Sequence, residues 1–142
     1  MEQESSLTTI AHVIQLAVAP VFLISGVGAL LAVLTNRLAR IIDRARQLDA
    51  LGPPTPEVRG ELTVLTDRAT YINRSIALVT SSALLIATLI VVLFLGAFLT
   101  LNVARAVGVL FVGAMIALIV GLVTFLQEVR LATRTLRLHS HQ

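Results

Sequence analysis

Three apolar stretches dominate this 142-residue chain, and each is long enough to cross a bilayer. They run from about residue 10 to 35, 75 to 101 and 107 to 125, and none contains Lys, Asp or Glu. A hydrocarbon core of about 30 Å requires about 20 mostly apolar helical residues. Because lipid offers no hydrogen bonds to the backbone, each stretch is expected to be an α-helix. The sequence therefore predicts an all-α membrane protein with three transmembrane helices.

Composition narrows the possible functions. The mean hydropathy is +0.91, and about 70 residues remain outside the three spans, too few for a separate enzyme domain. The absence of cysteine excludes disulfides and thiolate catalysis. No phosphate-binding loop, dinucleotide fingerprint, nucleophile–base pair or metal-ligand spacing is present. We expect a single membrane domain over residues 1–142 that is not an enzyme and uses no cofactor or metal.

The arginines indicate an orientation. Seven lie between the first two spans and three follow the third, whereas only Arg105 lies in the opposite connection. Cytoplasmic loops are enriched in basic residues, so the N-terminus is predicted outside and the 36–74 segment and C-terminus (126–142) in the cytoplasm. The net charge of +3 then indicates anionic lipid head groups as partners, not nucleic acid.

The first span is expected to be retained and not cleaved as a signal peptide. Ala17-Val18-Ala19 has the residue types of a cleavage site, but Pro20 follows it and the apolar run continues. Glu2 and Glu4 give the leading segment acidic charge, which is the opposite of a signal peptide.

The 36–74 segment is predicted to form an antiparallel helical hairpin that extends spans one and two into the cytoplasm. Apolar residues continue past both membrane boundaries with a spacing of four and three, and Gly52 to Pro56 separates the two helices. This seam comprises Leu34, Leu38, Ile41, Ala45 and Leu48, then Val58, Leu62, Leu65, Ala69, Ile72 and Ile76. One such hairpin buries little apolar surface, which favours a homo-oligomer.

Polar residues gather where the spans meet the cytoplasm. They are Asn36, Arg37, Asn73, Arg74, Gln127 and Glu128. Glu128 has no basic residue three or four positions away on its own helix, so Arg37 or Arg74 is its expected partner. This set forms either a clasp that fixes the helix ends or a polar gate at the mouth of a pore.

Small and hydroxyl residues mark the interior of the spans. Ser25, Ser81 and Ser82 are candidates to line a water-filled path, although such hydroxyls also bond to backbone carbonyls of their own helix. A second group favours close helix packing, with a gating hinge as the alternative. This group comprises Pro20, Gly26, Gly28, Gly113, Ala117 and Gly121.

The remaining charged residues indicate surface roles. Arg130, Arg134 and Arg137 form a basic stripe suited to anionic head groups or, alternatively, to attracting anions. His139 and His141 are interpreted as part of a solvated tail, and His12 as lying at the outer interface.

Three runs carry a family resemblance: LTNRLARIIDRARQL from Leu34, INRSI from Ile72 and QEVRLATRTLRL from Gln127. Together with Pro20, they resemble domain-of-unknown-function family 2721 over nearly the whole chain after residue 10. The resemblance implies a small bacterial membrane protein with three spans and an undefined activity. Ala132 stands where a Ser is expected in that family.

Two functional hypotheses follow from these patterns. The first is a homo-oligomeric ion channel of the bacterial inner membrane with a cytoplasmic helical vestibule. The second is a non-conducting scaffold or accessory protein whose hairpin binds an unidentified partner protein. The lack of a charge near the centre of any span disfavours proton pumps and ion-coupled transporters.

Overall fold

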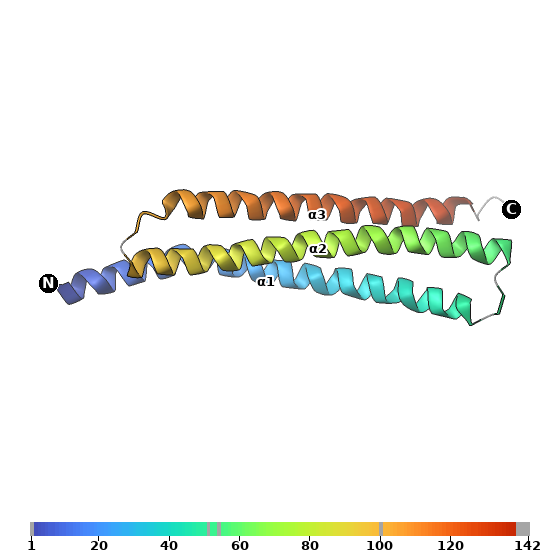
Figure 1. Cartoon of the computed structure of the whole chain (residues 1–142), viewed down its shortest axis with the longest axis horizontal. Coiled ribbons are helices and arrows are strands. Elements are labelled where there is room, and N and C mark those ends of the chain that lie inside the picture. Colours follow the sequence, from blue (N-terminus) through green and yellow to red (C-terminus); the bar gives the residue numbers. More distant parts are fainter. Residues whose placement is uncertain (1, 51, 54, 100, 139–142) are drawn as a thin grey trace.

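The computed structural model consists of three long helices laid side by side (Figure 1). The structure describes residues 2–50, 52–53, 55–99 and 101–138, with side chains from residue 7 to 130 within those ranges. Helix α1 spans Glu2–Asp49, α2 spans Pro56–Phe98 and α3 spans Ala104–Leu138. All three are long and apolar enough to cross a membrane, and the described residues contain no strand. The predicted all-α membrane fold is thus confirmed.

Helices α1 and α2 each continue well beyond the length of a bilayer crossing. Helix α1 remains helical through Pro20, whose ring is buried, and through the predicted boundary at Asn36. At 1.5 Å per residue, the 43 residues of α2 measure about 65 Å. The two helices lie antiparallel, with their turn beside the C-terminal end of α3 (Figure 1). The start of α1 and the α2–α3 connection lie at the other end of the molecule.

The turn between α1 and α2 follows from its local sequence. Gly52 adopts a φ of 102°, a conformation that costs a glycine little. Thr55 then caps α2, and its hydroxyl accepts a hydrogen bond from the Val58 amide. Pro56 occupies the first helical turn, where a missing amide donor costs nothing. Helix α2 therefore begins at Pro56, at the end of the Gly52–Pro56 segment expected to separate the two helices.

An apolar seam joins α1 to α2. Toward the α1–α2 turn its core contains Ile41, Leu48, Leu65 and Ile72, and predicted hairpin residues pack around them. Farther from the turn the seam continues through Val27, Leu34 and Val79. Six buried positions on α1 are spaced by seven residues, namely Val13, Pro20, Val27, Leu34, Ile41 and Leu48, and Ala17 is also buried. A strict seven-residue repeat favours the left-handed packing of a coiled coil.

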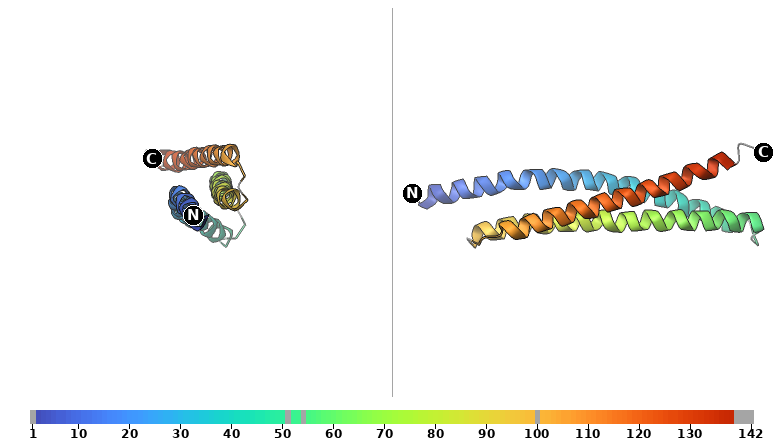
Figure 2. Two further views of the ribbon diagram at one scale, coloured as in Figure 1. Left: turned by 90° about the vertical axis from the view of Figure 1, so that its left-hand side faces the viewer. Right: turned by 90° about the horizontal axis from the view of Figure 1, so that it is seen from above.

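Helix α2 packs against both of its neighbours, whereas the backbones of α1 and α3 stay apart. Viewed from the end, the three helices form a triangle, with α1 and α3 each beside α2 (Figure 2). Only side chains bridge α1 to α3, as where Leu118 and Phe125 pack on the Val27–Leu34–Val79 cluster. This arrangement positions the polar cluster described next.

Candidate functional site: a buried ionic clasp joining three helices

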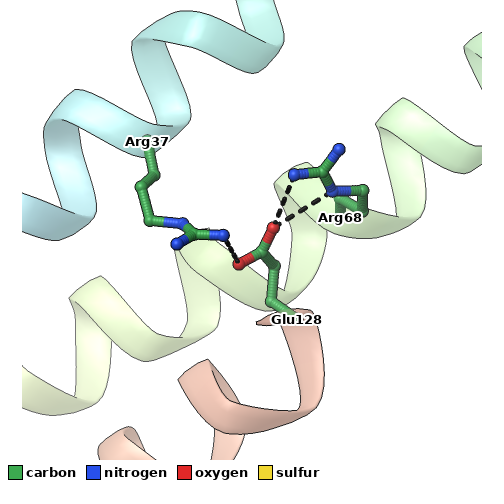
Figure 3. Close-up of polar contacts among 3 residues, drawn as sticks. All are labelled: Arg37, Arg68 and Glu128. Atoms are coloured by element: carbon green, nitrogen blue, oxygen red, sulfur yellow. Dashed lines mark hydrogen bonds and ion pairs between the residues drawn. The ribbon is translucent and has the colours of Figure 1, made fainter. Parts of the chain in front are cut away.

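Glu128 of α3 is fully buried, although it carries a formal charge. Its Oε1 accepts hydrogen bonds from Nε and Nη2 of Arg68 on α2, at 3.0 and 2.9 Å. Its Oε2 lies 3.0 Å from Nη2 of Arg37 on α1. One carboxylate thus contacts a guanidinium on each of the other two helices (Figure 3). We call Arg37, Arg68 and Glu128 the ionic clasp.

The Arg68–Glu128 and Arg37–Glu128 contacts differ in hydrogen-bond geometry. Arg68 presents two donors to the same oxygen, an arrangement that fixes the geometry of both side chains. The Arg37 nitrogen is at ion-pair distance, but its N–H bonds are not aligned for a hydrogen bond, and Oε2 accepts none from the described residues. Arg37 also lies over the Phe125 ring, 5.3 Å from its centroid, which adds a cation–π contact. Charge attraction to Glu128 and the contact with Phe125 therefore hold Arg37 in place.

The clasp is in line with two further polar contacts between α2 and α3. Ser75 Oγ donates a 2.6 Å hydrogen bond to the Gly121 carbonyl, and Ser82 Oγ donates one of 2.8 Å to the Ala114 carbonyl. Both serines are fully buried. These contacts and the Arg68–Glu128 pair follow each other at seven-residue intervals on both helices. Together they set the register of α3 against α2.

Gly121 permits the close approach on which this register depends. A Cβ added there would lie 2.9 Å from Val79 Cγ2 and 3.3 Å from Leu78 Cβ. At Gly113, two turns earlier, the nearest atom to an added Cβ is Leu85 Cδ1, at an ordinary 3.7 Å. Ala117 is half-buried between them. At Gly26 and Gly28 on α1, an added Cβ would have no atom of another described element within 4 Å.

The predicted inner-boundary set is only partly gathered in space. Arg37 and Glu128 meet, whereas Asn36, Asn73, Arg74 and Gln127 are exposed. Arg37 is one of the two partners expected for Glu128; the other partner is Arg68 and not Arg74.

The candidate pore-lining serines differ in burial. Ser82 is buried between α2 and α3, so its hydroxyl serves helix packing and does not line a path. Ser25 and Ser81 are exposed, and each donates to a carbonyl one turn earlier, that of Val21 and Ala77 respectively. His139 and His141 lie outside the described residues, as do the side chains of Ala132, Arg134 and Arg137.

Sequence reasoning overlooked Arg68 because it was counted only as part of the cytoplasmic positive charge. A signal for it exists: Arg68, Ser75 and Ser82 are spaced by seven residues, and so are Ala114, Gly121 and Glu128. A heptad repeat of polar residues on one helix and a heptad repeat of two small residues and Glu128 on the adjacent antiparallel helix predict that the pairs face each other.

Comparison with known families matches residues 17–138, which includes the seam, the clasp and both buried serines. The chain belongs to the family described as Protein of unknown function (DUF2721). The family resemblance seen in the sequence is thereby confirmed, and with it the assignment to a family of undefined activity. No curated protein and no solved structure matches the chain significantly.

Proposed function

We propose that the chain is the subunit of a homo-oligomeric ion channel of the bacterial inner membrane, with α1 bordering the central axis. The observation that carries this proposal is the outer face of α1. Ser25, Ala29, Ala32 and Asn36 are all exposed and are spaced by four, three and four residues, which places them on one helix face. Each is two positions from Val27 or Leu34, and therefore about 200° around the helix from the seam.

This face differs from the exposed face of α3. Helix α3 exposes large residues suited to lipid, including Val109, Val112, Ile116 and Ile119. In lipid, small residues allow two helices to approach closely, and Ser and Asn side chains hydrogen-bond between helices. The Ser25–Asn36 face therefore supports contact with α1 of a second copy.

A ring of copies supplies what one subunit lacks. In one subunit α1 and α3 pack on α2, and the described residues enclose no aqueous path between them. Several α1 helices around an axis would present Ser25 and Asn36 to such a path. The cytoplasmic extensions of α1 and α2 would then form a vestibule rich in arginine, which favours anions electrostatically.

A non-conducting scaffold is the second candidate, and the polar contacts within the subunit favour it. Glu128 is taken up by Arg37 and Arg68, and Ser82 by the Ala114 carbonyl, so these groups are committed to packing. A scaffold would use the cytoplasmic hairpin to bind a partner protein and would need no central path.

Disulfide crosslinking tests the oligomer, because the natural chain has no cysteine. Ala32→Cys is expected to give an oxidised dimer in membranes. Val112→Cys, which is exposed on α3 and outside the proposed interface, is the control and should remain monomeric. Equal crosslinking of both variants, or a monomeric wild type in mild detergent, would contradict the proposed interface.

Ion flux separates the channel from the scaffold. Purified protein in liposomes should pass chloride or potassium, and a thiol reagent should reduce that flux in Ala32→Cys but not in Val112→Cys. Crosslinking of Ala32→Cys without flux across salts, voltages and membrane tension would retain the oligomer and favour the scaffold.

A further inference from the structure

A hollow of 320 Å³ lies against the ionic clasp, between the cytoplasmic parts of α1 and α2. Its volume is at the lower end of the range for small-molecule sites, about 300 to 1,000 Å³. Six residues line it, four of them arginines: Arg37, Arg40, Ile41, Arg44, Leu65 and Arg68. Such a concentration of guanidinium groups around one hollow indicates an anionic ligand.

The charges around the hollow are only partly balanced within the chain. Arg37 and Arg68 share the single carboxylate of Glu128, and Arg44 pairs with Glu61 through a 2.8 Å contact. Four guanidiniums therefore face two carboxylates, which leaves an excess of two positive charges. Arg40 has no carboxylate partner among the ion pairs of the described residues. Binding of an inorganic phosphate dianion would offset this excess, and the single negative charge of a phospholipid phosphodiester would offset half of it.

Ion pairs within the chain orient two of the arginines that line the hollow. Glu128 holds Arg68 through Nε and Nη2, and the exposed Glu61 pairs with Arg44 through Nε, so the remaining N–H groups of both side chains are available to a ligand. Arginine recognises phosphate through paired N–H donors, and a side chain that is already ordered loses little entropy on binding. Ile41 and Leu65 add apolar walls to the same hollow.

The depth of the hollow matches a phospholipid head group. If the apolar span of α1 ends at Asn36, Arg37 lies about 2 Å, and Arg40 about 6 Å, beyond the hydrocarbon core. The head-group layer on each side of a bilayer is about 5 to 8 Å thick. Arg44 lies deeper in the aqueous phase, at about 12 Å, where it is accessible to dissolved anions.

We propose that this hollow is a binding site for a phosphate group, carried either by an anionic phospholipid or by free phosphate. Arg40 and Arg44 bind the phosphate oxygens, and the ionic clasp positions Arg37 and Arg68 beside them. The site is complete within one subunit, so it depends neither on conduction nor on the oligomer. A negative flux or crosslinking result would leave it unaffected.

The first experimental arm uses inorganic phosphate. Full-length protein in an uncharged maltoside detergent is titrated with phosphate that replaces chloride at constant ionic strength, and binding is followed by calorimetry and thermal unfolding. Arg40→Gln should weaken binding by about tenfold or more, the loss expected for one charge-assisted hydrogen bond. Arg46→Gln removes the same charge from an exposed position on α1 outside the hollow and should bind like the wild type.

The second arm uses short-chain phosphatidylglycerol, with short-chain phosphatidylcholine as the zwitterionic control. Binding of phosphatidylglycerol but not of inorganic phosphate, again weakened by Arg40→Gln and not by Arg46→Gln, would assign the site to a lipid head group. Binding of inorganic phosphate with the same variant pattern would assign it to free phosphate. No binding in either arm, or equal losses in the two variants, would overturn the proposal, because only diffuse charge attraction would remain.

Discussion

The hydroxyl of Ser75 donates a 2.6 Å hydrogen bond to the carbonyl of Gly121, and both residues are buried where α2 crosses α3. The same register repeats seven residues away on either side, in the Ser82–Ala114 contact and the Arg68–Glu128 pair. A seven-residue interval on both helices keeps one face of each turned to the other along their length. The apolar membrane crossing and the charged clasp are therefore parts of one helix interface.

Replacing Ser75 by Ala should destabilise the fold by about 0.6 kcal/mol, and by no more than about 1.7 kcal/mol, the range for hydrogen bonds between membrane helices. The control is Ser81→Ala on the same helix, because the Ser81 hydroxyl is exposed and donates to the Ala77 carbonyl one turn earlier in α2. The free energy of unfolding in bicelles, measured by steric trapping, provides the comparison. Equal losses would show that the Ser75–Gly121 bond contributes nothing beyond a local backbone contact.

Gly121→Ala should cost about 1 to 3 kcal/mol, the usual penalty for overpacking, because its Cβ would lie 2.9 Å from the stiff Val79 side chain. Gly113→Ala adds the same methyl group where the nearest atom is 3.7 Å away, and it should be neutral within experimental error. Thermal unfolding in detergent distinguishes the two variants. A neutral Gly121→Ala would mean that α2 and α3 are not so closely packed.

Glu128→Gln should destabilise the chain by about 3 kcal/mol or more, because it leaves two partly buried guanidiniums without a counter-charge. Glu61→Gln, which breaks the exposed pair with Arg44, should cost no more than about 1 kcal/mol. Chemical denaturation of the two variants in the same detergent gives the comparison. Similar small losses would place Glu128 in contact with water.

A charge exchange identifies the partners of Glu128. Glu128→Arg alone should be strongly destabilising, and adding Arg68→Glu or Arg37→Glu should recover part of the loss, because each restores an opposite pair. Adding Arg74→Glu should recover none, because Arg74 is exposed and makes no ion pair with Glu128. Thermal unfolding of the single and double variants measures the recovery. The geometry of the clasp would be contradicted if Arg74→Glu restored stability to Glu128→Arg and neither Arg68→Glu nor Arg37→Glu did.

Much of this architecture is predictable because membrane helices and coiled-coil seams leave long-range repeats in the sequence. The apolar spacing from Leu34 to Leu48 and from Val58 to Ile76 gives the α1–α2 hairpin, and the structure packs those residues together. Local chemistry at Thr55 and Pro56 fixes the start of α2. These features depend on neighbours in the sequence or on simple periodicity.

The composition of the clasp was less predictable, because it depends on which face of α2 meets α3. Arg74 is next to Ser75 in sequence and matches the predicted membrane boundary, but one residue corresponds to a rotation of about 100° around the helix. Arg74 therefore faces outward, while Arg68, one heptad before Ser75, faces Glu128. The position of a residue along its helix limits which arginines can reach Glu128. The face of the helix on which each arginine lies then determines which of them makes the contact.

The orientation of the chain in the membrane is open to a direct test with single cysteines. If the basic segment is cytoplasmic, Pro53→Cys at the hairpin turn should resist a membrane-impermeant maleimide in intact cells and react after permeabilisation. Asn102→Cys, exposed in the α2–α3 connection, should react in intact cells. Gel-shift labelling of both variants gives the comparison. The reverse pattern would put the hairpin, the clasp and the arginine-lined hollow outside the cell, where the proposed cytoplasmic vestibule could not form.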